Sequence, residues 1–300
     1  MMKILKKINI LLLSSLLLFA CKEDNLDPNS VLVDLEVDQN ELDNYIGEHF
    51  TKDYNIAIVY KYVEAESDMD YNLSPARYES AVRMTKLLQY LGIEPYDKVM
   101  GNKDFMRTYF PKLLNYIGSP AYRNNGTFVL GTAEGGIKIT LYALNELTAE
   151  TSTNIAFLNE YYFHTMHHEF AHILHQTKDY PASFAEIAGS SYVSDSWNDI
   201  YDDRNELAAV ISDGFISAYA SKEPNEDFVE MYSHYITMSS DQWESRINAG
   251  DQIGKEMIEA KLDIVKTYFQ NTWAIDLDVL RQEIMTRQAN LPDFDQTSLN

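Results

Sequence analysis

The chain has 300 residues, of which 45% are hydrophobic, and its 46 acidic and 24 basic residues give a formal net charge of −22 at pH 7. A surface this acidic repels phosphate backbones and anionic lipid headgroups, which argues against nucleic acid as a partner and against membrane binding through charge. The length allows one catalytic domain with a substantial core or two small domains.

The first 20 residues have the pattern of a secretion signal. Three lysines among the first seven residues precede an apolar run, Ile8 to Ala20, which is too short to span a bilayer because a spanning helix needs about 20 residues. The run leads into Leu18-Phe19-Ala20-Cys21, which resembles the lipobox of bacterial lipoproteins, whose signal is cleaved before a cysteine that then carries lipid. The alternative, an ordinary signal with a chance cysteine, is less favoured because a single thiol can form no internal disulfide. We therefore predict a lipoprotein signal peptide over residues 1–20 and lipidation at Cys21.

Residues 21–40 have the polar, acidic composition of a flexible tether. Within them Lys22-Glu23-Asp24 resembles the signal that sends some lipoproteins to the outer face of the outer membrane, although it can equally be the start of the tether. We expect the protein at the outer membrane, held by lipid alone, with the choice between the periplasmic and the surface face left open.

The part of the chain from Leu42 to Gly92 is predicted to contain both helices and a strand. Leu42 to Phe50 suits a short helix, and the β-branched and aromatic residues from Tyr54 to Val63 favour a buried strand. Ser74-Pro75 has the N-cap and first-turn residues of a helix start, and apolar residues at helical spacing continue from Tyr78 to Leu91 until Gly92 ends the helix.

A further helix is predicted from Phe105 to Ile117. After it the residue pattern changes from helical to β-type. Gly126 to Gly131 and Gly136 to Tyr142 are two short β-type runs around a glycine-containing turn, so we expect a hairpin. An edge strand of this kind, just ahead of the helix that follows, can pair with the backbone of an extended ligand. An ordinary sheet strand with a covered edge is the alternative.

One predicted helix contains a motif that is typical of metal-dependent hydrolases. Leu158 to Gln176 has neither glycine nor proline and is predicted to be a helix, and it contains His168-Glu169-Phe170-Ala171-His172, an H-E-x-x-H motif. His168 and His172 stand one turn apart on one helix face, roughly 5–6 Å between Cβ atoms, so both imidazoles can reach one zinc ion. Glu169 lies beside that face, where a carboxylate can deprotonate the water that the ion activates. The motif predicts hydrolysis.

A chance match of five residues in a chain with seven histidines is the alternative, and the helical context makes it less favoured. His164 and His175 share the same face. We expect them to support the site, cap the helix or lie at the surface, because catalytic zinc usually has three protein ligands and a water.

The rest of the chain is predicted to be helical, without internal repeats. The expected elements are a loop from Lys178 to Asp203 with a short helix at Phe184 to Ala188, and helices at Asn205 to Tyr219, Glu226 to Thr237, Trp243 to Phe269 with an interruption near Gly250, and Leu277 to Gln288.

A third zinc ligand must come from outside the motif. A histidine six residues after His172 is excluded, because position 178 is a lysine. An acidic residue on a later helix remains, and both Glu186, fourteen residues downstream, and Glu226 are candidates.

A resemblance favours Glu226. The segment from Tyr219 to Glu230 resembles the gluzincins of the anthrax lethal factor type, in which a ligand glutamate stands in E-x-F-A-E and a tyrosine lies seven residues before it. Glu226 matches the ligand, Glu230 the second glutamate and Tyr219 the tyrosine. Val229 departs from the usual alanine, which puts packing rather than chemistry in doubt.

With the lipobox and these two runs, the chain resembles the substrate import-associated zinc metallohydrolase lipoproteins. That resemblance implies a lipid-anchored metallopeptidase linked to a TonB-dependent nutrient importer and its starch-binding-type lipoprotein. It also implies an α+β, zincin-like fold that is helix-rich with a small mixed sheet, in a domain of residues 41–300 with an N-terminal lobe (about 41–150) and a metal-binding, C-terminal lobe (about 151–300).

The resemblance further implies a role for each site residue. His168, His172 and Glu226 would bind Zn²⁺, and Glu169 would move protons between the attacking water and the leaving amine. Tyr219 would donate to the oxyanion of the tetrahedral intermediate, and Glu230 would orient a ligand histidine.

We therefore predict zinc-dependent hydrolysis of peptide or protein substrates at the outer membrane. The main rival is a non-catalytic accessory lipoprotein that binds a substrate and holds zinc only structurally, which Glu169 disfavours because a structural site needs no base. A hydrolase of non-peptide amides is a third option.

Overall fold

A computed structural model describes residues 39–68, 70–122, 128–129, 131–134, 137–201 and 206–299. The chain divides into two units, residues 1–38 and 39–300, and the second contains all the described residues. The predicted signal peptide, the predicted lipidation site Cys21 and nearly all of the predicted tether lie outside the described residues. Among the described helices, none combines the length and the apolar composition needed to cross a bilayer.

A small mixed sheet is the β part of the fold. Its strands run in the order β1 (Ala57–Val59), β2 (Leu113–Tyr116), β6 (Lys138–Leu141), β5 (Gly131–Glu134), with β1, β2 and β6 parallel and β5 antiparallel to β6. The register aligns the buried side chains of Ile58, Leu114 and Ile139 in one row across the sheet. A second, two-stranded sheet pairs β3 (Ala121–Tyr122) with β4 (Phe128–Val129).

Helices make up most of the described chain. In order they are α2 (Glu41–Ile46), α3 (Tyr78–Leu87), α4 (Glu94–Met100), α5 (Asp104–Tyr109), α6 (Ile155–Leu158), α7 (His164–Thr177), α8 (Ser183–Ala188), α9 (Trp197–Ile200), α10 (Leu207–Ser212), α11 (Pro224–Thr237), α12 (Ser240–Ile247), α13 (Gln252–Trp273) and α14 (Leu277–Ala289). Three π-helical segments, η2 (Gly47–Lys52), η4 (Leu88–Ile93) and η7 (Asn159–Phe163), and the 3₁₀ turn η10 (Tyr219–Ser221) lie between them. The predicted α+β fold, rich in helix with a small mixed sheet, is confirmed.

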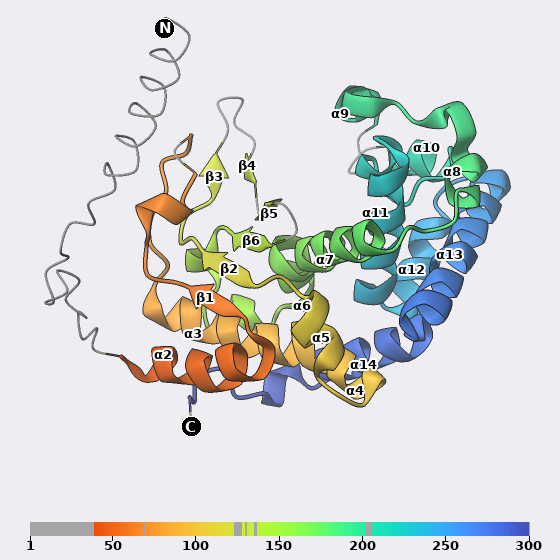
Figure 1. The fold of residues 1–300 in the computed structure, drawn as a ribbon. Coiled ribbons are helices and arrows are strands. Elements are labelled where there is room, and N and C mark those ends of the chain that lie inside the picture. The colour runs from red at the N-terminus through yellow and green to blue at the C-terminus, as the bar shows by residue number, and fades with distance from the viewer. Residues whose placement is uncertain are drawn as a thin grey trace, which may run out of the picture. The chain divides into compact units, whose positions relative to one another are not determined.

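Helix α7 lies between the sheet and α11 (Figure 1). It continues from α6 and η7 without a break, so residues 155–177 form one helical rod. The edge strand β5 meets its first turn, where a Cβ atom added to Gly131 would lie 2.7 Å from Thr165 Cγ2. Only glycine permits this close approach, which holds the sheet edge beside the start of the metal-motif helix.

Helix α11 is the most buried element near α7. Of its 14 residues 11 are buried, and it packs on α7, α13 and α14. Among the buried residues is Asp227, whose Oδ2 lies 2.6 Å from Lys261 Nζ on α13, with both side chains fully buried. One face of α11 therefore contacts the motif helix while another is tied to α13 by an ion pair.

Two predictions about the α3 region are wrong. Ser74-Pro75 does not start a helix: Pro75 bridges Ile117, and α3 begins at Tyr78. Gly92 does not end one, because the helix continues through η4 into α4. A Cβ at Gly92 would lie 2.6 Å from Met166 Cε, so this glycine permits a close helix contact.

The predicted helix from Phe105 to Ile117 is wrong in its second half. Helix α5 ends at Tyr109, and Phe110, which precedes a proline, is extended with ψ of 146°. Residues before proline disfavour the helical region, and the chain after it pairs between β1 and β6 as strand β2.

Three other predictions are wrong in their extent. The strand predicted for Tyr54 to Val63 is only β1, and the helix predicted up to Tyr219 is only α10, which ends before Gly214, a glycine with φ of +83°. The hairpin exists, but its first strand is β5, whereas Phe128–Val129 pairs with β3. The helices predicted at the motif, at Phe184 to Ala188 and in the C-terminal part are confirmed, with Gly250 between α12 and α13.

Candidate metal centre

Helices α7 and α11 bring three predicted ligands together. His172 Nε2 lies 3.2 Å from His168 Nε2, and Glu226 Oε2 lies 3.2 Å from His168 Nε2 and 3.1 Å from His172 Nε2. Three ligand atoms at tetrahedral positions, about 2.0–2.1 Å from zinc, stand about 3.3–3.4 Å from one another. The observed triangle is therefore close to the size that zinc requires, and its two-imidazole, one-carboxylate composition is a zinc donor set.

Glu186 does not belong to this cluster. It is exposed on α8 and is in neither of the two groups of donors, among the described residues, that could hold a metal ion. Those groups are His168 with His172 and Glu226, and His164 with His168 and Glu230. Of the two acidic candidates left open by the sequence, the structure brings Glu226 to the histidines.

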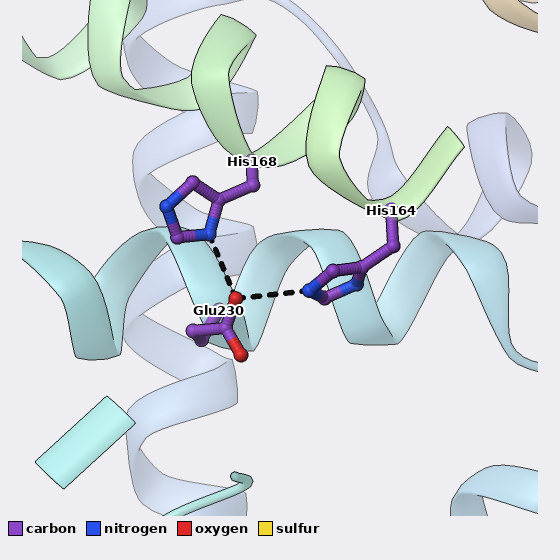
Figure 2. Close-up of side chains that lie close together, drawn as sticks. All are labelled: His164, His168 and Glu230. Atoms are coloured by element: carbon purple, nitrogen blue, oxygen red, sulfur yellow. Dashed lines mark hydrogen bonds and ion pairs between the residues drawn. The ribbon is translucent and has the colours of Figure 1, made fainter. Parts of the chain in front are cut away.

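The second group, His164 with His168 and Glu230, orients a ligand of the first group. Figure 2 shows His164 and His168, both from α7, pointing at one oxygen of Glu230 on α11. His168 Nδ1 lies 2.7 Å and His164 Nε2 2.9 Å from Glu230 Oε1. With Nδ1–H donated to Glu230, His168 presents Nε2 toward Glu226 and His172, and the Nε2 lone pair becomes available to a metal once its proton leaves. The pair is thus a carboxylate–histidine support, in which Glu230 fixes the tautomer and orientation of a ligand.

Glu230 has a full set of donors. Besides the two α7 histidines, Ser217 Oγ donates to Oε2 at 2.5 Å and His234 Nε2 lies 3.3 Å from the same oxygen. Although burial opposes it, His164 and the other donors hold the pKa of this buried carboxyl well below its usual range. Glu230 is therefore a charged, fully hydrogen-bonded group.

His172 has a different support. Its Nδ1 lies 3.0 Å from His175 Nε2, so it donates to a neighbouring imidazole in place of a carboxylate. Burial, together with His172, lowers the pKa of His175 to about 4, which keeps that ring neutral. The motif's other neighbour, His167, points away and bonds Tyr96 at 2.9 Å, and burial lowers its pKa to about 3.

Glu169 lies beside the three donors without a fixed partner. It is half-buried and forms no hydrogen bond or ion pair with any residue in the described part of the chain. Burial raises the pKa of its carboxyl, with His168 and His172 opposing the shift and Glu226 and Glu230 adding to it. A carboxyl with a raised pKa beside an ion is suited to accept and return protons.

The other oxygen of Glu226 has two donors. Tyr219 donates to Oε1 at 3.0 Å and Lys222 Nζ lies 3.2 Å from it, while Lys222 is also 3.4 Å from the Tyr219 oxygen. Burial and the Glu226 charge raise the pKa of Tyr219, so its hydroxyl keeps its proton. The ring packs edge-on against Trp197 of α9, with centroids 5.1 Å apart.

Charges in the cluster are coupled. Burial acts to lower the pKa of His168, but hydrogen bonds to Glu226 and Glu230 outweigh it and raise that pKa to about 10. The histidines in turn lower the pKa of Glu226 against the effect of its burial. Without an ion the ligand imidazole is protonated, so a metal must take the place of a proton.

Sequence reasoning missed Lys222, Ser217 and His234. Helical spacing could not have found Lys222, because Glu223, which separates it from α11, is extended with φ of −164° and ψ of 163°. Ser217 had no signal either, since it lies in the irregular chain between α10 and η10. His234 could have been found, because it stands four residues after Glu230 on the same helix.

Comparisons with known proteins identify the family and the fold. Residues 35–278 match the family described as "Putative zinc-binding metallo-peptidase". Among solved structures the chain is similar to the crystal structure of a protein of the same description from Bacteroides caccae, with 37% identity, a TM-score of 0.75, and coverage of 90% of this chain and 100% of that one. No curated protein matches the chain. The similarity confirms the predicted metallopeptidase fold.

Proposed function

The chain belongs to the family of zinc-binding metallo-peptidases just described, and from that premise we propose that it is a zinc-dependent peptidase. The observation that carries the proposal is the position of Glu169, a proton acceptor that bonds no residue in the described part of the chain and lies beside three donors that fit zinc. A purely structural site has no use for such a group.

Each side chain has a defined task in this reaction. Zinc held by His168, His172 and Glu226 would polarise the peptide carbonyl and lower the pKa of water toward ~7. Glu169 takes a proton from the attacking water on its carboxylate and passes it to the leaving amine. Tyr219 donates its hydroxyl hydrogen to the oxygen that develops negative charge. Glu230 holds His168 in the tautomer that leaves Nε2 free.

A peptide backbone has a place to bind. Strand β5 stands at the edge of its sheet, with β6 as its one partner among the described strands. Gly131, its first residue, lies against Thr165 in the first turn of α7. An extended substrate paired with β5 would pass beside the motif helix, and main-chain pairing of this kind favours a peptide over other amides.

A variant at Glu169 tests the enzyme proposal. Glu169→Gln should retain zinc, measured by metal analysis, and lose nearly all cleavage of a broad peptide library, because the amide cannot accept the proton. Glu160→Gln, which changes an exposed acid on the same helical rod, is the matched control and should keep wild-type activity.

Two results would reject the enzyme. One is a wild-type protein that holds zinc yet cleaves no peptide, which would favour the accessory lipoprotein that binds substrate around a structural zinc. The other is equal cleavage by wild type and Glu169→Gln. If the protein cleaves only non-peptide amides, the same residues would catalyse hydrolysis of a different substrate class.

We also propose that the enzyme is anchored by lipid at Cys21 to the outer membrane and acts beside a TonB-dependent importer and its starch-binding-type lipoprotein. The support is the signal and lipobox pattern of residues 1–21. Cys21→Ser should release the protein from the membrane fraction and abolish labelling by a palmitate analogue. A labelled Cys21→Ser protein would contradict the anchor, and failure to copurify with an importer after crosslinking would contradict the partnership.

A further inference from the structure

The two oxygens of Glu226 have separate contacts. Oε2 lies within 3.2 Å of both ligand imidazoles, which makes it the oxygen that faces the metal. Oε1 accepts from Tyr219 at 3.0 Å and from Lys222 at 3.2 Å. The Glu226 side chain is 9% exposed and that of Lys222 is 27% exposed. The lysine thus reaches the buried carboxylate from the rim of the site.

In this arrangement Tyr219 cannot donate to Glu226 and to a substrate at the same time. A tyrosine hydroxyl has one hydrogen, and here it is donated to Glu226. The same hydrogen cannot at that moment serve a substrate oxygen. If Tyr219 turned away and no other donor remained, a desolvated carboxylate oxygen would be left unsatisfied, which costs free energy.

Lys222 removes this conflict. Its ammonium carries three hydrogens and already contacts Glu226 Oε1, so the oxygen keeps a charged donor when the hydroxyl leaves. Lys222 Nζ also lies 3.4 Å from the Tyr219 oxygen and 5.3 Å from its ring centroid, so the lysine is already in contact with both the carboxylate and the tyrosine.

The backbone that carries both residues is fixed. Val193 N donates to Ser221 O at 2.9 Å and Ser194 N donates to Lys222 O at 3.0 Å, tying the turn to the segment before α9. The Tyr219 ring also rests on Trp197. The change that frees the hydrogen is therefore a movement of side chains over a held main chain.

We propose that Lys222 is a positioning residue that holds the outer oxygen of the ligand Glu226, so that the Tyr219 hydroxyl is free to donate to the substrate. We make this inference on the premise that the chain is a peptidase. Its core is a two-donor arrangement, in which either Tyr219 or Lys222 alone is enough to keep Glu226 oriented toward zinc.

A double-mutant cycle in zinc affinity tests the arrangement without any substrate. Chelator competition would give the zinc Kd of the full-length protein and of Tyr219→Phe, Lys222→Met and the double variant. Each single variant should bind zinc within about twofold of wild type, whereas the double variant should lose about thirtyfold or more, well beyond the roughly fourfold product of the single losses, because Oε1 then has no donor. Single losses that simply add in the double variant would overturn the proposal.

Turnover at saturating zinc supplies the second readout. On a peptide that the wild type cleaves, Lys222→Met should lower kcat by the same factor as Tyr219→Phe with KM unchanged, since the hydroxyl stays on Glu226. Lys222→Arg should restore kcat. Wild-type kcat in Lys222→Met at saturating zinc would show that the lysine acts only on metal binding, and would overturn the proposal.

Controls separate folding and function. Tyr201→Phe and Lys255→Met remove a hydroxyl bonded to Asp213 and an ammonium near Glu259, and neither should change zinc affinity or kcat. If no peptide is cleaved, the proposed function fails. The zinc cycle then decides the inference alone, with non-additive losses supporting the two donors and additive losses rejecting them.

Discussion

Two faces of helix α11 carry buried carboxylates with opposite uses. Toward α13, Asp227 meets Lys261, and Lys261 also donates to Gly214 O at 2.8 Å with its Nζ 4.4 Å from the Phe215 ring centroid. Toward α7, Glu226 and Glu230 face imidazoles. The difference is in the partner: an ammonium locked in the core is a permanent counterion, whereas an imidazole can exchange its proton for a metal. One face stabilises the fold and the other forms the candidate metal centre.

The largest expected effect comes from breaking the fold-side pair. Lys261→Met should destabilise the protein by ~3–5 kcal/mol, because it leaves the Asp227 charge buried without a counterion. The melting temperature should fall by roughly 10 °C. Adding Asp227→Asn should recover part of the loss.

The matched control for that change is Lys52→Met. It removes an exposed pair with Glu48, 3.1 Å apart on the surface, and should change stability by less than about 1 kcal/mol. An unchanged melting temperature in Lys261→Met would contradict the claim that the α13 side of α11 stabilises the fold.

On the other face, Glu226→Gln should remove metal binding and spare the fold. Zinc affinity should drop by more than the ~10–100-fold typical of supporting residues, because a ligand charge is lost. The metal-free melting temperature should fall much less than in Lys261→Met. Glu186→Gln is the control, and a loss of zinc affinity there equal to that of Glu226→Gln would reassign the third ligand.

Glu230→Gln tests a residue that orients a metal ligand, for comparison with Glu226, which is predicted to bind the metal itself. The amide keeps the shape but loses the charge that fixes three histidines, so zinc affinity should fall ~10–100-fold. Calorimetric zinc titration would measure it, with the exposed Glu223→Gln as control. Wild-type affinity in Glu230→Gln would show that its four contacts are only packing.

The imidazole face should also respond to pH. The His168 pKa is raised to about 10 in the metal-free protein, so its charged form contributes stability below pH 6.5, and that contribution disappears as pH rises through 10. The lowered pKa values of Glu226 and Glu230 contribute stability above about pH 4.5 that is lost in acid. Zinc replaces a proton, so its affinity should rise about tenfold per pH unit from pH 6 to 8. A zinc Kd that does not change over that range would contradict the proton exchange.

The smallest effect is expected at His175. This residue offers His172 a neutral acceptor, and its replacement in His175→Phe should weaken zinc binding by only about 2–10-fold, the value of one neutral hydrogen bond. Chelator competition side by side with Glu230→Gln would show whether the charged support is the stronger one. A larger loss at His175 would reverse that ranking.

The sequence predicted the site better than it predicted the surrounding sheet. His168, Glu169 and His172 could be placed because they lie within one helical turn, where spacing alone sets geometry. Glu226 needed a resemblance, because 54 residues separate it from His172 and helix packing brings the two together. Strand β2 was predicted as helix, since pairing between two strands from distant parts of the chain decides its structure. The Asp227 and Lys261 pair had no local signal at all.

The five π-helical residues Asn159–Phe163 just before α7 carry a consequence for how this rod can vary. A π-helical turn accommodates one residue more than an α-helical turn, so it takes up the extra residue while the helix on either side keeps its direction. Deleting a single residue here would relax the turn to ordinary helix and leave α6 and α7 in nearly their present relative orientation. A deletion within α7 ahead of His168 would instead rotate the preceding helix by about 100° around the axis, and the bonds from Asn159 to Thr237 O and from Tyr162 to Ala143 O would be lost. A one-residue length change is therefore tolerated better at this turn than in the regular helix that follows it.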